Sequence, residues 1–361
     1  MYKVFLIAIL CFVLFLILLK EKHNFEYTDV AFLDVGQGDG ALIEVNGHDN
    51  ANVYSGNHIT RLMIDTGKSS KTITSIENFY NRDLYNYFYN HEYFTWMSIF
   101  TLSGTQREDR SSAETIDILL LTHNDDDHIG MRCAIVEKYH VKKIIISDSI
   151  STSSLLSCDK DGYIKSGIKK FQTNRKDKNG NTTSTKEPGI EVLSVHTGDS
   201  FNINDNKFYI LNPDQNFNPK SNHDNEESIV VLATIDTNNN LTPNPSLKER
   251  VVNSNNVKIL FTGDIDKKVE RGIINEDATP TPSPSLKGRG IRNIDILKVA
   301  HHGSDGSSDP IFIKYIHPTV SVISVGKNNY GHPSPRVIND LISASSTIHR
   351  TDQEGNVVFH F

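Results

Sequence analysis

The segment 122–130, Thr-His-Asn-Asp-Asp-Asp-His-Ile-Gly, constrains the fold of this chain more than any other stretch. It directly follows the apolar run Ile116–Leu121, which has the composition of a buried strand. It holds four side chains of the metal-ligand type within six positions: His123, Asp125, Asp127 and His128. Imidazoles and carboxylates at this density lose hydration or repel one another unless a cation lies among them. Mixed nitrogen and oxygen donors suit zinc, manganese or iron.

Acidic loops that contain histidine are also common on protein surfaces without any ion, so the segment alone leaves the two readings evenly balanced. Three further apolar strands, however, end in the same kinds of side chain. Leu62–Asp65 and Leu260–Asp264 each end in an aspartate, and the strand from Ile294 leads to His301 and His302. Four such strand ends are improbable by chance and favour a metal centre. Neighbouring histidines on an extended backbone point in different directions, so we expect only one of this pair to bind the metal directly.

A glycine turn follows another apolar strand, in the segment 32–39, Phe-Leu-Asp-Val-Gly-Gln-Gly-Asp. It brings Asp34, Gln37 and Asp39 to one end of a sheet. Carboxylates in such a place, like Asp65, could hold metal-bound histidines from behind. Taken singly, each of these turns is more often an ordinary Asx-Gly turn.

Composition describes a globular body with a separate N-terminus. The 361 residues suffice for one large or two modest domains, and 37% are hydrophobic. A net charge of −7 argues against a protein that coats nucleic acids generally. Two cysteines outside the N-terminal run, Cys133 and Cys158, are too few to imply a disulfide framework and leave the redox compartment open.

The run Val4–Leu19 is apolar without interruption and is flanked by lysines on both sides. At 1.5 Å per residue it spans roughly 24 Å, slightly less than a bilayer core of about 30 Å. No small-residue cleavage site follows it, so we expect residues 1–22 to be a transmembrane or signal-anchor segment rather than a removed signal peptide. Charges at both ends leave the orientation open.

Short strand-like runs recur from residue 27 to the C-terminus, with few helices between them. The predicted strands are 30–35, 41–45, 62–65, 116–121, 143–147, 191–195, 207–211, 228–235, 257–261, 294–299, 319–325 and 357–361. The predicted helices are 131–139, 265–274, 310–316 and 335–344, the last two beginning with Asp-Pro and Ser-Pro start signals. This order predicts an α+β domain over 27–361, with two sheets packed face to face and helices outside.

Four segments interrupt this domain as predicted loop insertions, at about 68–114, 160–188, 237–256 and 276–292. Two of them contain a near-repeat, Thr-Pro-Asn-Pro-Ser-Leu-Lys-Glu-Arg at 242–250 and Thr-Pro-Ser-Pro-Ser-Leu-Lys-Gly-Arg at 281–289. Two proline-rich copies are too few for a solenoid and are typical of tolerated surface loops.

The ordered motifs DVGQGD, IDTG, THNDDDHIG, TGD and HHGS, followed by Tyr-Gly-His-Pro-Ser at 330–334, resemble the metallo-β-lactamase-fold domain of ComEC competence proteins. Phosphorylcholine-esterase-type enzymes have a similar pattern. The resemblance covers about residues 29–361. It implies an αββα sandwich with one or two divalent ions, Zn²⁺ or Mn²⁺, at the edges of the sheets.

The resemblance also implies roles for single residues. His123 and Asp125 would bind one ion, Asp127 and His128 the other, and Asp264 would bridge them. His301 or His302 would complete the second site, while Asp34, Asp39 and Asp65 would support the ligands from behind. Most of the superfamily has histidine where Asp125 stands, and the usual third-motif histidine is absent near 225–229, where only His223 is a weak substitute. A first site of this kind would either be weak or, because it is oxygen-rich, favour manganese over zinc.

The expected activity is metal-dependent hydrolysis of a phosphoester, in which an ion activates water for in-line attack. Asp127 would orient that water or take its proton, and His332 and Tyr330 would donate to a phosphoryl oxygen. The first hypothesis is a membrane-anchored nuclease or phosphodiesterase acting on single-stranded DNA, with its domain outside the cytoplasm of a bacterial cell. The alternatives are an envelope phosphodiesterase of the phosphorylcholine-esterase type and a catalytically silent metal-binding module in DNA uptake. Since nothing beyond Val4–Leu19 could span a membrane, a separate channel protein would have to supply any pore.

Overall fold

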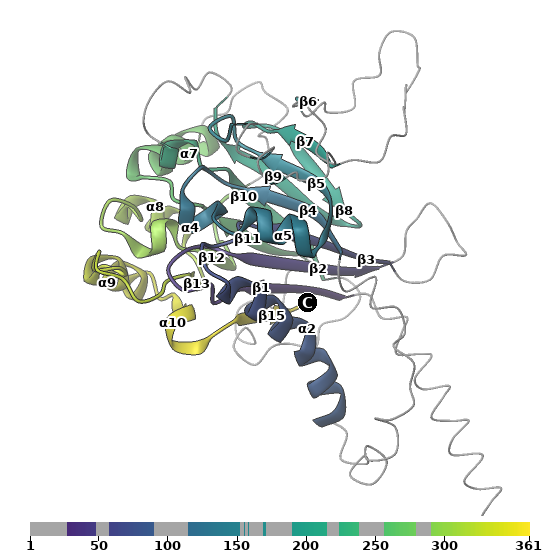
Figure 1. The fold of residues 1–361 in the computed structure, drawn as a ribbon. Coiled ribbons are helices and arrows are strands. Elements are labelled where there is room, and N and C mark those ends of the chain that lie inside the picture. The colour runs from purple at the N-terminus through teal and green to yellow at the C-terminus, as the bar shows by residue number, and fades with distance from the viewer. Residues whose placement is uncertain are drawn as a thin grey trace, which may run out of the picture.

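The computed structural model describes residues 27–47, 58–89, 115–151, 155, 158, 169–170, 190–214, 224–237, 256–278 and 290–361. Within them, two mixed β-sheets pack face to face with helices on both outer faces (Figure 1). The α+β class and the two-sheet arrangement expected from the sequence are therefore confirmed.

The first sheet has eight strands in the order β15-β1-β2-β3-β4-β5-β7-β6. β3, β4, β5 and β7 run parallel to one another, whereas β15, β1, β2 and β3 pair antiparallel. The bounds are β1 Tyr27–Phe32, β2 Ala41–Gly47, β3 His58–Ile64, β4 Thr115–Leu121, β5 His140–Ile146, β6 Lys169–Lys170, β7 Glu191–Ser194 and β15 Val357–His360.

The second sheet has seven strands in the order β14-β13-β12-β11-β10-β9-β8. The four strands from β11 to β14 are parallel, and β8 to β11 are antiparallel. The bounds are β8 Ser200–Ile203, β9 Asn206–Asn212, β10 Val230–Asp236, β11 Asn256–Phe261, β12 Ile296–Lys298, β13 Val320–Ile323 and β14 Thr347–Arg350.

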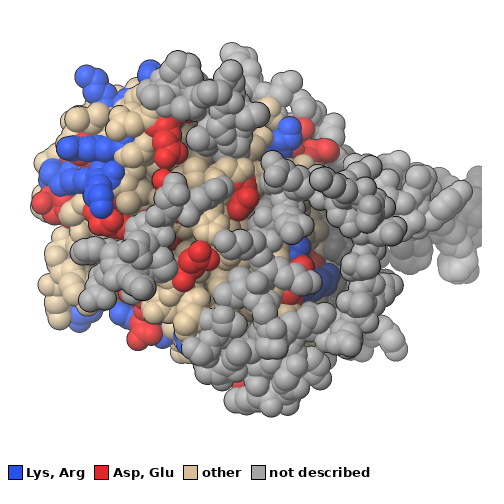
Figure 2. Space-filling model, turned by 90° about the horizontal axis from the view of Figure 1, so that it is seen from above, with Lys and Arg blue, Asp and Glu red and all other residues tan. Residues whose placement is uncertain are grey.

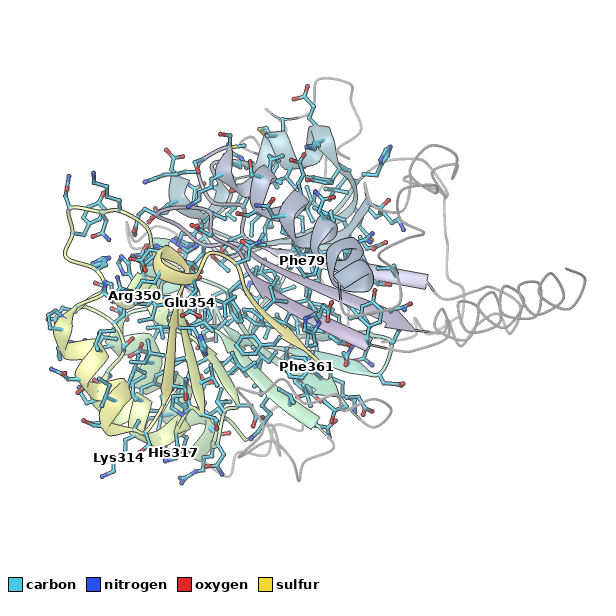
Figure 3. All side chains as sticks on the ribbon, turned by 90° about the horizontal axis from the view of Figure 1, so that it is seen from below. Phe79, Lys314, His317, Arg350, Glu354 and Phe361 are labelled. Atoms are coloured by element: carbon cyan, nitrogen blue, oxygen red, sulfur yellow. A yellow bond between two sulfur atoms is a disulfide. The ribbon has the colours of Figure 1, made fainter. Side chains whose placement is uncertain are left out.

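The central core fills the space between the sheets, where Phe32 of β1 stacks against Phe261 of β11 with ring centroids 5.7 Å apart. Helices α2 (Lys71–Tyr89) and α5 (Arg132–Lys138) cover the first sheet. Helices α7 (Lys267–Ala278), α8 (Pro310–Ile316) and α9 (Pro335–Ser343) cover the second. Figure 3 shows Phe79 of α2 on one outer face and Lys314 of α8 on the other. Short helices α4 (Asp126–Ile129), α10 (Thr351–Glu354), η1 (Asp224–Glu227) and η2 (Ala300–Gly303) lie in the connections.

Every predicted strand overlaps an observed one, and the two helices with proline start signals begin where the sequence predicts. Asp309 caps α8 by accepting a hydrogen bond from the Ile311 N–H, and Ser334 caps α9 by accepting one from the Arg336 N–H. Because β3 and β4 are parallel in one sheet, and β11, β12 and β13 in the other, their carboxyl ends meet along one edge of the sandwich. This edge carries the candidate site.

The predicted insertions fall largely outside the described residues. Within 68–114, residues 71–89 form α2, whose Ile76 and Phe79 are buried against the first sheet. Cys133 of α5 forms a disulfide bond with Cys158, a pairing that the sequence left open. The predicted membrane segment 1–22 also lies outside the described residues, and none of the helices within them is long and apolar enough to cross a bilayer.

Candidate metal centre

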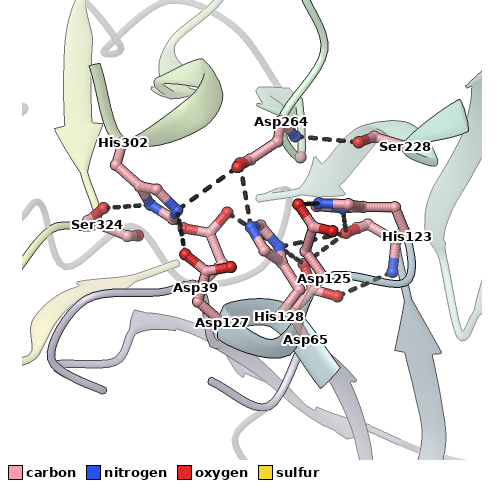
Figure 4. Close-up of polar contacts among 12 residues, drawn as sticks. Asp39, Asp65, His123, Asp125, Asp127, His128, Ser228, Asp264, His302 and Ser324 are labelled. Atoms are coloured by element: carbon pink, nitrogen blue, oxygen red, sulfur yellow. Dashed lines mark hydrogen bonds and ion pairs between the residues drawn. The ribbon is translucent and has the colours of Figure 1, made fainter. Parts of the chain in front are cut away.

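The strand ends bring a compact group of histidines and aspartates together, shown in Figure 4. The first sheet supplies residues that follow β3, β4 and the β1–β2 turn, and the second supplies residues that follow β11 and β12. We call this set the metal cluster; its members are Asp39, Asp65, His123, Asp125, Asp127, His128, Asp264 and His302. All but Asp125 and Asp127 are buried.

His128 lies at the centre of the cluster. Its Nε2 is 3.1 Å from Oδ1 of Asp264, and its Nδ1 is 2.8 Å from Oδ2 of Asp65. Asp65 is itself fixed, because it accepts hydrogen bonds from the backbone N–H of Thr122 at 2.8 Å and from the Thr122 hydroxyl at 2.7 Å. The Asp65 carboxylate therefore fixes the orientation of the imidazole, so that Nε2 faces the cluster.

His302 approaches from the second sheet. Its Nδ1 donates to the Ser324 carbonyl oxygen at 2.8 Å, while its Nε2 lies 3.3 Å from Oδ2 of Asp127 and 3.5 Å from Oδ2 of Asp264. Neither His301 nor His302 has the extended backbone assumed in the sequence analysis, since their φ angles are 50° and 53°. His301 lies at the rim, with its Nε2 3.7 Å from Oδ2 of Asp264.

His123 and Asp125 form the other side of the cluster, with His123 Nε2 3.5 Å from Asp125 Oδ2. Near 225–229, where the third-motif histidine is absent, Ser228 has a buried hydroxyl that accepts a hydrogen bond from the Asp264 N–H at 3.2 Å. Ser228 thus positions the carboxylate at the centre. His223 lies outside the described residues.

The turn that carries Asp39 packs directly onto α4. The Asp39 N–H donates to the Asp127 carbonyl at 3.0 Å, and a Cβ on Gly38 would lie 2.2 Å from that same oxygen. Gly38 has a φ of +140°, so a side chain here would meet both steric overlap and backbone strain. The glycine therefore lets the turn approach close enough to add Asp39 to the cluster.

Lys298, the last residue of β12, is a member of the site that the sequence analysis missed. Its buried ammonium group forms an ion pair with Asp39, donates to the Gly263 carbonyl at 3.0 Å and lies 3.7 Å from Asp264 Oδ1. The sequence did contain a sign of this role, because Lys298 lies in the mostly apolar run 294–299. A lysine is almost never fully buried without a partner, so its place in a buried strand indicates a nearby acidic group.

Mutual attraction shifts the pKa values within the cluster. Burial disfavours the charged form of Asp264, His128 and His302, but the opposite charges around each of these three side chains have the larger effect on its pKa. His128 and His302 hold the pKa of Asp264 well below its ordinary value, and Asp264 and Asp65 hold that of His128 well above. Burial also opposes charge on His302, yet Asp264 and Asp39 raise its pKa to about 9. A divalent cation attracted by these carboxylates would displace the protons from both imidazoles on binding.

The residues fit such a cation. Among the described side chains, five buried atoms of the cluster have no hydrogen-bond partner: Asp39 Oδ1, His123 Nε2, His128 Nε2, Asp264 Oδ1 and His302 Nε2. Buried polar atoms in proteins are otherwise nearly always paired. The groups His123–His128–Asp264 and Asp127–His128–His302 each bring three ligand atoms within 4.8 Å of one another. This donor set suits one or two divalent ions, with Asp264 and His128 between the two groups.

Besides His301 at the rim, three predicted residues lie outside the cluster. Asp34 was expected behind the ligands, but its carboxylate instead pairs with Lys71 at 2.5 Å. His332 lies beside the rim, its ring centroid 5.6 Å from that of His301, and its Nδ1 is buried without a hydrogen-bond partner. Burial and the neighbouring His301 lower the pKa of His332 below its ordinary value. Tyr330 is 72% exposed and reaches the cluster only through His332, with ring centroids 5.7 Å apart.

Asp65→Asn is expected to weaken binding of the divalent ion by about 10- to 100-fold, because the carboxylate that orients His128 is lost. The matched control is Asp29→Asn, which alters a buried aspartate paired with His360 at 2.6 Å away from the cluster. Calorimetric titration with Mn²⁺ would measure both variants. Equal affinities for Asp65→Asn and wild type would contradict the role given to Asp65.

Comparisons with known proteins show similarity to two longer bacterial proteins. It is 28% identical to ComE operon protein 3 of Bacillus subtilis over 247 residues, covering 68% of the chain and 25% of that protein. It is 24% identical to Recombination protein 2 of Haemophilus influenzae over 357 residues, covering 98% of the chain and 31% of that protein. The chain thus spans between a quarter and a third of the length of these relatives. No family model matches it.

Solved structures show distant similarity. The metallo-β-lactamase fold protein YhfI from Bacillus subtilis aligns over 92% of the chain and 100% of its own, with 9% identity and a TM-score of 0.42. The long form of RNase Z from yeast aligns over 92% of the chain and 42% of its own, with 10% identity and a TM-score of 0.43. Values this low give no information about activity. The chain is a homologue of ComE operon protein 3 and of Recombination protein 2, and its described part forms two mixed sheets with helices outside.

Proposed function

We propose that this ComEC-type, metallo-β-lactamase-like domain is a divalent-metal-dependent phosphodiesterase that hydrolyses DNA, most readily as a single strand. The observation that carries the proposal is the convergence, from both sheets on one place, of five buried ligand atoms that have no hydrogen-bond partner. The relationship to proteins named for competence and recombination supports DNA as the substrate class. The oxygen-rich donor set, in which Asp125 stands beside His123, supports Mn²⁺ as the ion.

A bound divalent ion would polarise a phosphoryl oxygen and make water acidic enough to attack phosphorus near neutral pH. The chain's own residues supply the rest. Asp127 would take the proton of the attacking water: its side chain is partly exposed, whereas that of Asp264 is buried, and its Oδ2 lies 3.3 Å from His302 Nε2. His332, beside the rim, would donate to a phosphoryl oxygen of the substrate.

The location that we propose is outside the cytoplasm, with the domain anchored through Val4–Leu19. The disulfide bond between Cys133 and Cys158 supports an oxidising compartment.

The proposal is tested by assaying the full chain, purified in mild detergent, on single-stranded DNA and on bis-p-nitrophenyl phosphate with Mn²⁺ or Zn²⁺. Hydrolysis of both substrates would support the nuclease. Hydrolysis of the small diester alone would favour the envelope phosphodiesterase of the phosphorylcholine-esterase type. Bound metal without hydrolysis of either substrate would favour the catalytically silent module.

His332→Ala is expected to lower turnover of bis-p-nitrophenyl phosphate by roughly 100-fold, because one donor to the phosphoryl oxygen is lost. Metal affinity should remain close to wild type, since His332 is not among the clustered ligand atoms. His349→Ala is a suitable control, as His349 pairs with Glu354 on α10 at 2.8 Å. Unchanged turnover in His332→Ala would remove His332 from the mechanism.

A further inference from the structure

A second feature lies next to the metal cluster, a cleft of about 720 Å³. Its walls come from three segments that are far apart in the sequence: the turn at 34–37, the start of α2 at 68–71 and the loop 326–330 after β13, with Asp352 of α10 beside them. We call it the lysine cleft. Its volume lies within the range of roughly 300–1,000 Å³ usual for ligand-binding clefts.

Positive charge in this cleft is only partly neutralised. Three lysines and two aspartates line it. Lys71 pairs with Asp34 at 2.5 Å, and the other aspartate, Asp352, pairs with Arg350 at 2.7 Å. Lys68 and Lys327 are exposed and have no ion-pair partner within the part of the chain that the structure describes. Two ammonium groups are therefore available for an anionic ligand.

Some basic residues elsewhere are neutralised by acidic neighbours. Figure 2 shows lysine and arginine side chains gathered over the end of the molecule where α7, α8 and α9 lie, with acidic side chains among them. On α7, Lys268 pairs with Glu226 at 2.8 Å and Arg271 pairs with Asp309 at 2.6 Å. The lysine cleft, by contrast, brings two exposed lysines without such a partner among the described residues onto the walls of one cleft.

An exposed aromatic ring stands on one wall of the cleft. Tyr330 is 72% exposed, yet its loop is held firmly by Asn328. The Asn328 side chain accepts hydrogen bonds from the N–H groups of Tyr330 and His332, each at 3.1 Å, and donates to the carbonyls of Gly326 and His332, each at 2.9 Å. A ring held on a fixed loop and open to solvent suits stacking against a flat ligand, as on the base platforms of single-strand-binding proteins.

The cleft also connects with the metal cluster. Tyr330 contacts His332, His332 contacts His301, and the His301 Nε2 lies 3.7 Å from Asp264 Oδ2. On the opposite wall, Lys68 packs against α4, where a Cβ on Gly130 would lie 2.9 Å from the Lys68 Cα. A polymer lying in the cleft would therefore run beside the residues that would hold the ion.

We propose that the lysine cleft binds the nucleotides next to the scissile phosphodiester of a single-stranded nucleic acid. Lys68 and Lys327 contact backbone phosphates, and Tyr330 stacks on an unpaired base. This inference rests on the proposed function and specifies its substrate: a base can stack on Tyr330 only when it is not held in a duplex.

Binding is measured without catalysis, by fluorescence anisotropy of a labelled single-stranded oligonucleotide with the full chain in chelator. The variant Lys68→Gln/Lys327→Gln is compared with Lys207→Gln/Lys314→Gln, which removes the same charge from exposed positions on β9 and α8. Each lost phosphate contact should reduce the slope of log K against log salt by about 0.7, hence by about 1.4 for the cleft variant. The control variant should keep the wild-type slope.

Tyr330→Ala should weaken binding by about 10- to 100-fold, and Tyr330→Trp should preserve it. Equal salt slopes for the cleft variant and wild type would overturn the inference. The inference would also be overturned if the chain bound single strands and duplexes with equal affinity and the Tyr330→Ala variant bound single strands as tightly as wild type. Because binding is read in chelator, wild-type binding that depends on these residues supports the cleft even if no hydrolysis is found. If the wild-type chain hydrolyses DNA but the cleft variants bind the oligonucleotide as tightly as wild type does, the proposed function would be supported and the binding role of the lysine cleft would be contradicted.

Discussion

Replacing Asp264 with asparagine is expected to lower hydrolysis of bis-p-nitrophenyl phosphate by about 10³-fold or more, equivalent to roughly 4 kcal/mol of transition-state stabilisation. The carboxylate stands between the two candidate ligand groups, with Oδ1 3.1 Å from His128 Nε2 and Oδ2 3.5 Å from His302 Nε2. An amide would remove the negative charge and turn a donor toward the ion. Bound metal should fall together with turnover.

The matched control for this change is Asp295→Asn. Asp295 lies just before β12 and accepts a hydrogen bond from the Lys258 N–H at 2.8 Å, which the asparagine oxygen can still accept. Its turnover and metal content should stay close to wild type. Turnover within tenfold of wild type in Asp264→Asn would show that this carboxylate does not hold the reactive ion.

Lys298→Met is expected to lower the free energy of unfolding by about 3–5 kcal/mol in chelator, because removing one member of a buried ion pair leaves the other charge without compensation. The group left without its partner is the Asp39 carboxylate. Burial alone would raise the pKa of Asp39, but the positive charges of Lys298 and His302 hold it below its ordinary value. Urea denaturation followed by circular dichroism measures the effect.

A double variant distinguishes the loss of the ion pair from a general destabilisation of the fold. Adding Asp39→Asn to Lys298→Met removes the stranded charge and should restore part of the lost stability, so the two changes should not be additive. Saturating metal should also reduce the cost, since an ion can take over part of the compensation. A loss below about 1 kcal/mol, or strict additivity, would contradict the role given to the ion pair.

The sandwich was predictable because its strands are apolar and its helix starts are marked. β4 and β11 read directly as buried runs, and Asp309 and Ser334 mark α8 and α9. β14, with the sequence Thr-Ile-His-Arg, was missed because it is only partly buried and therefore lacks an apolar pattern. α4 was missed because its four residues, Asp-Asp-His-Ile, have the composition of an acidic loop; tertiary contacts, including the Thr66 N–H to the His128 carbonyl, fix its place.

The sequence predicted which residues form the candidate site better than it predicted how their side chains are arranged. The presence of ligand-type side chains at the ends of apolar strands predicted that His123, His128, Asp264 and Asp65 come together from distant positions in the sequence. It could not distinguish His301 from His302, because the left-handed backbone that directs His302 inward depends on tertiary context. It also misplaced Asp34, which an ion pair with Lys71 draws toward the lysine cleft.

The central claim is that the metal cluster binds a divalent ion that makes the chain a phosphodiesterase. Its most direct test is a titration of the chelated full chain with Mn²⁺, in which ion binding and hydrolysis of bis-p-nitrophenyl phosphate are followed together. We predict saturable binding of one or two ions with release of protons, and turnover that rises in proportion to the bound ion. Absence of binding by both Mn²⁺ and Zn²⁺ at millimolar concentration would contradict the claim, as would a saturated site with no hydrolysis.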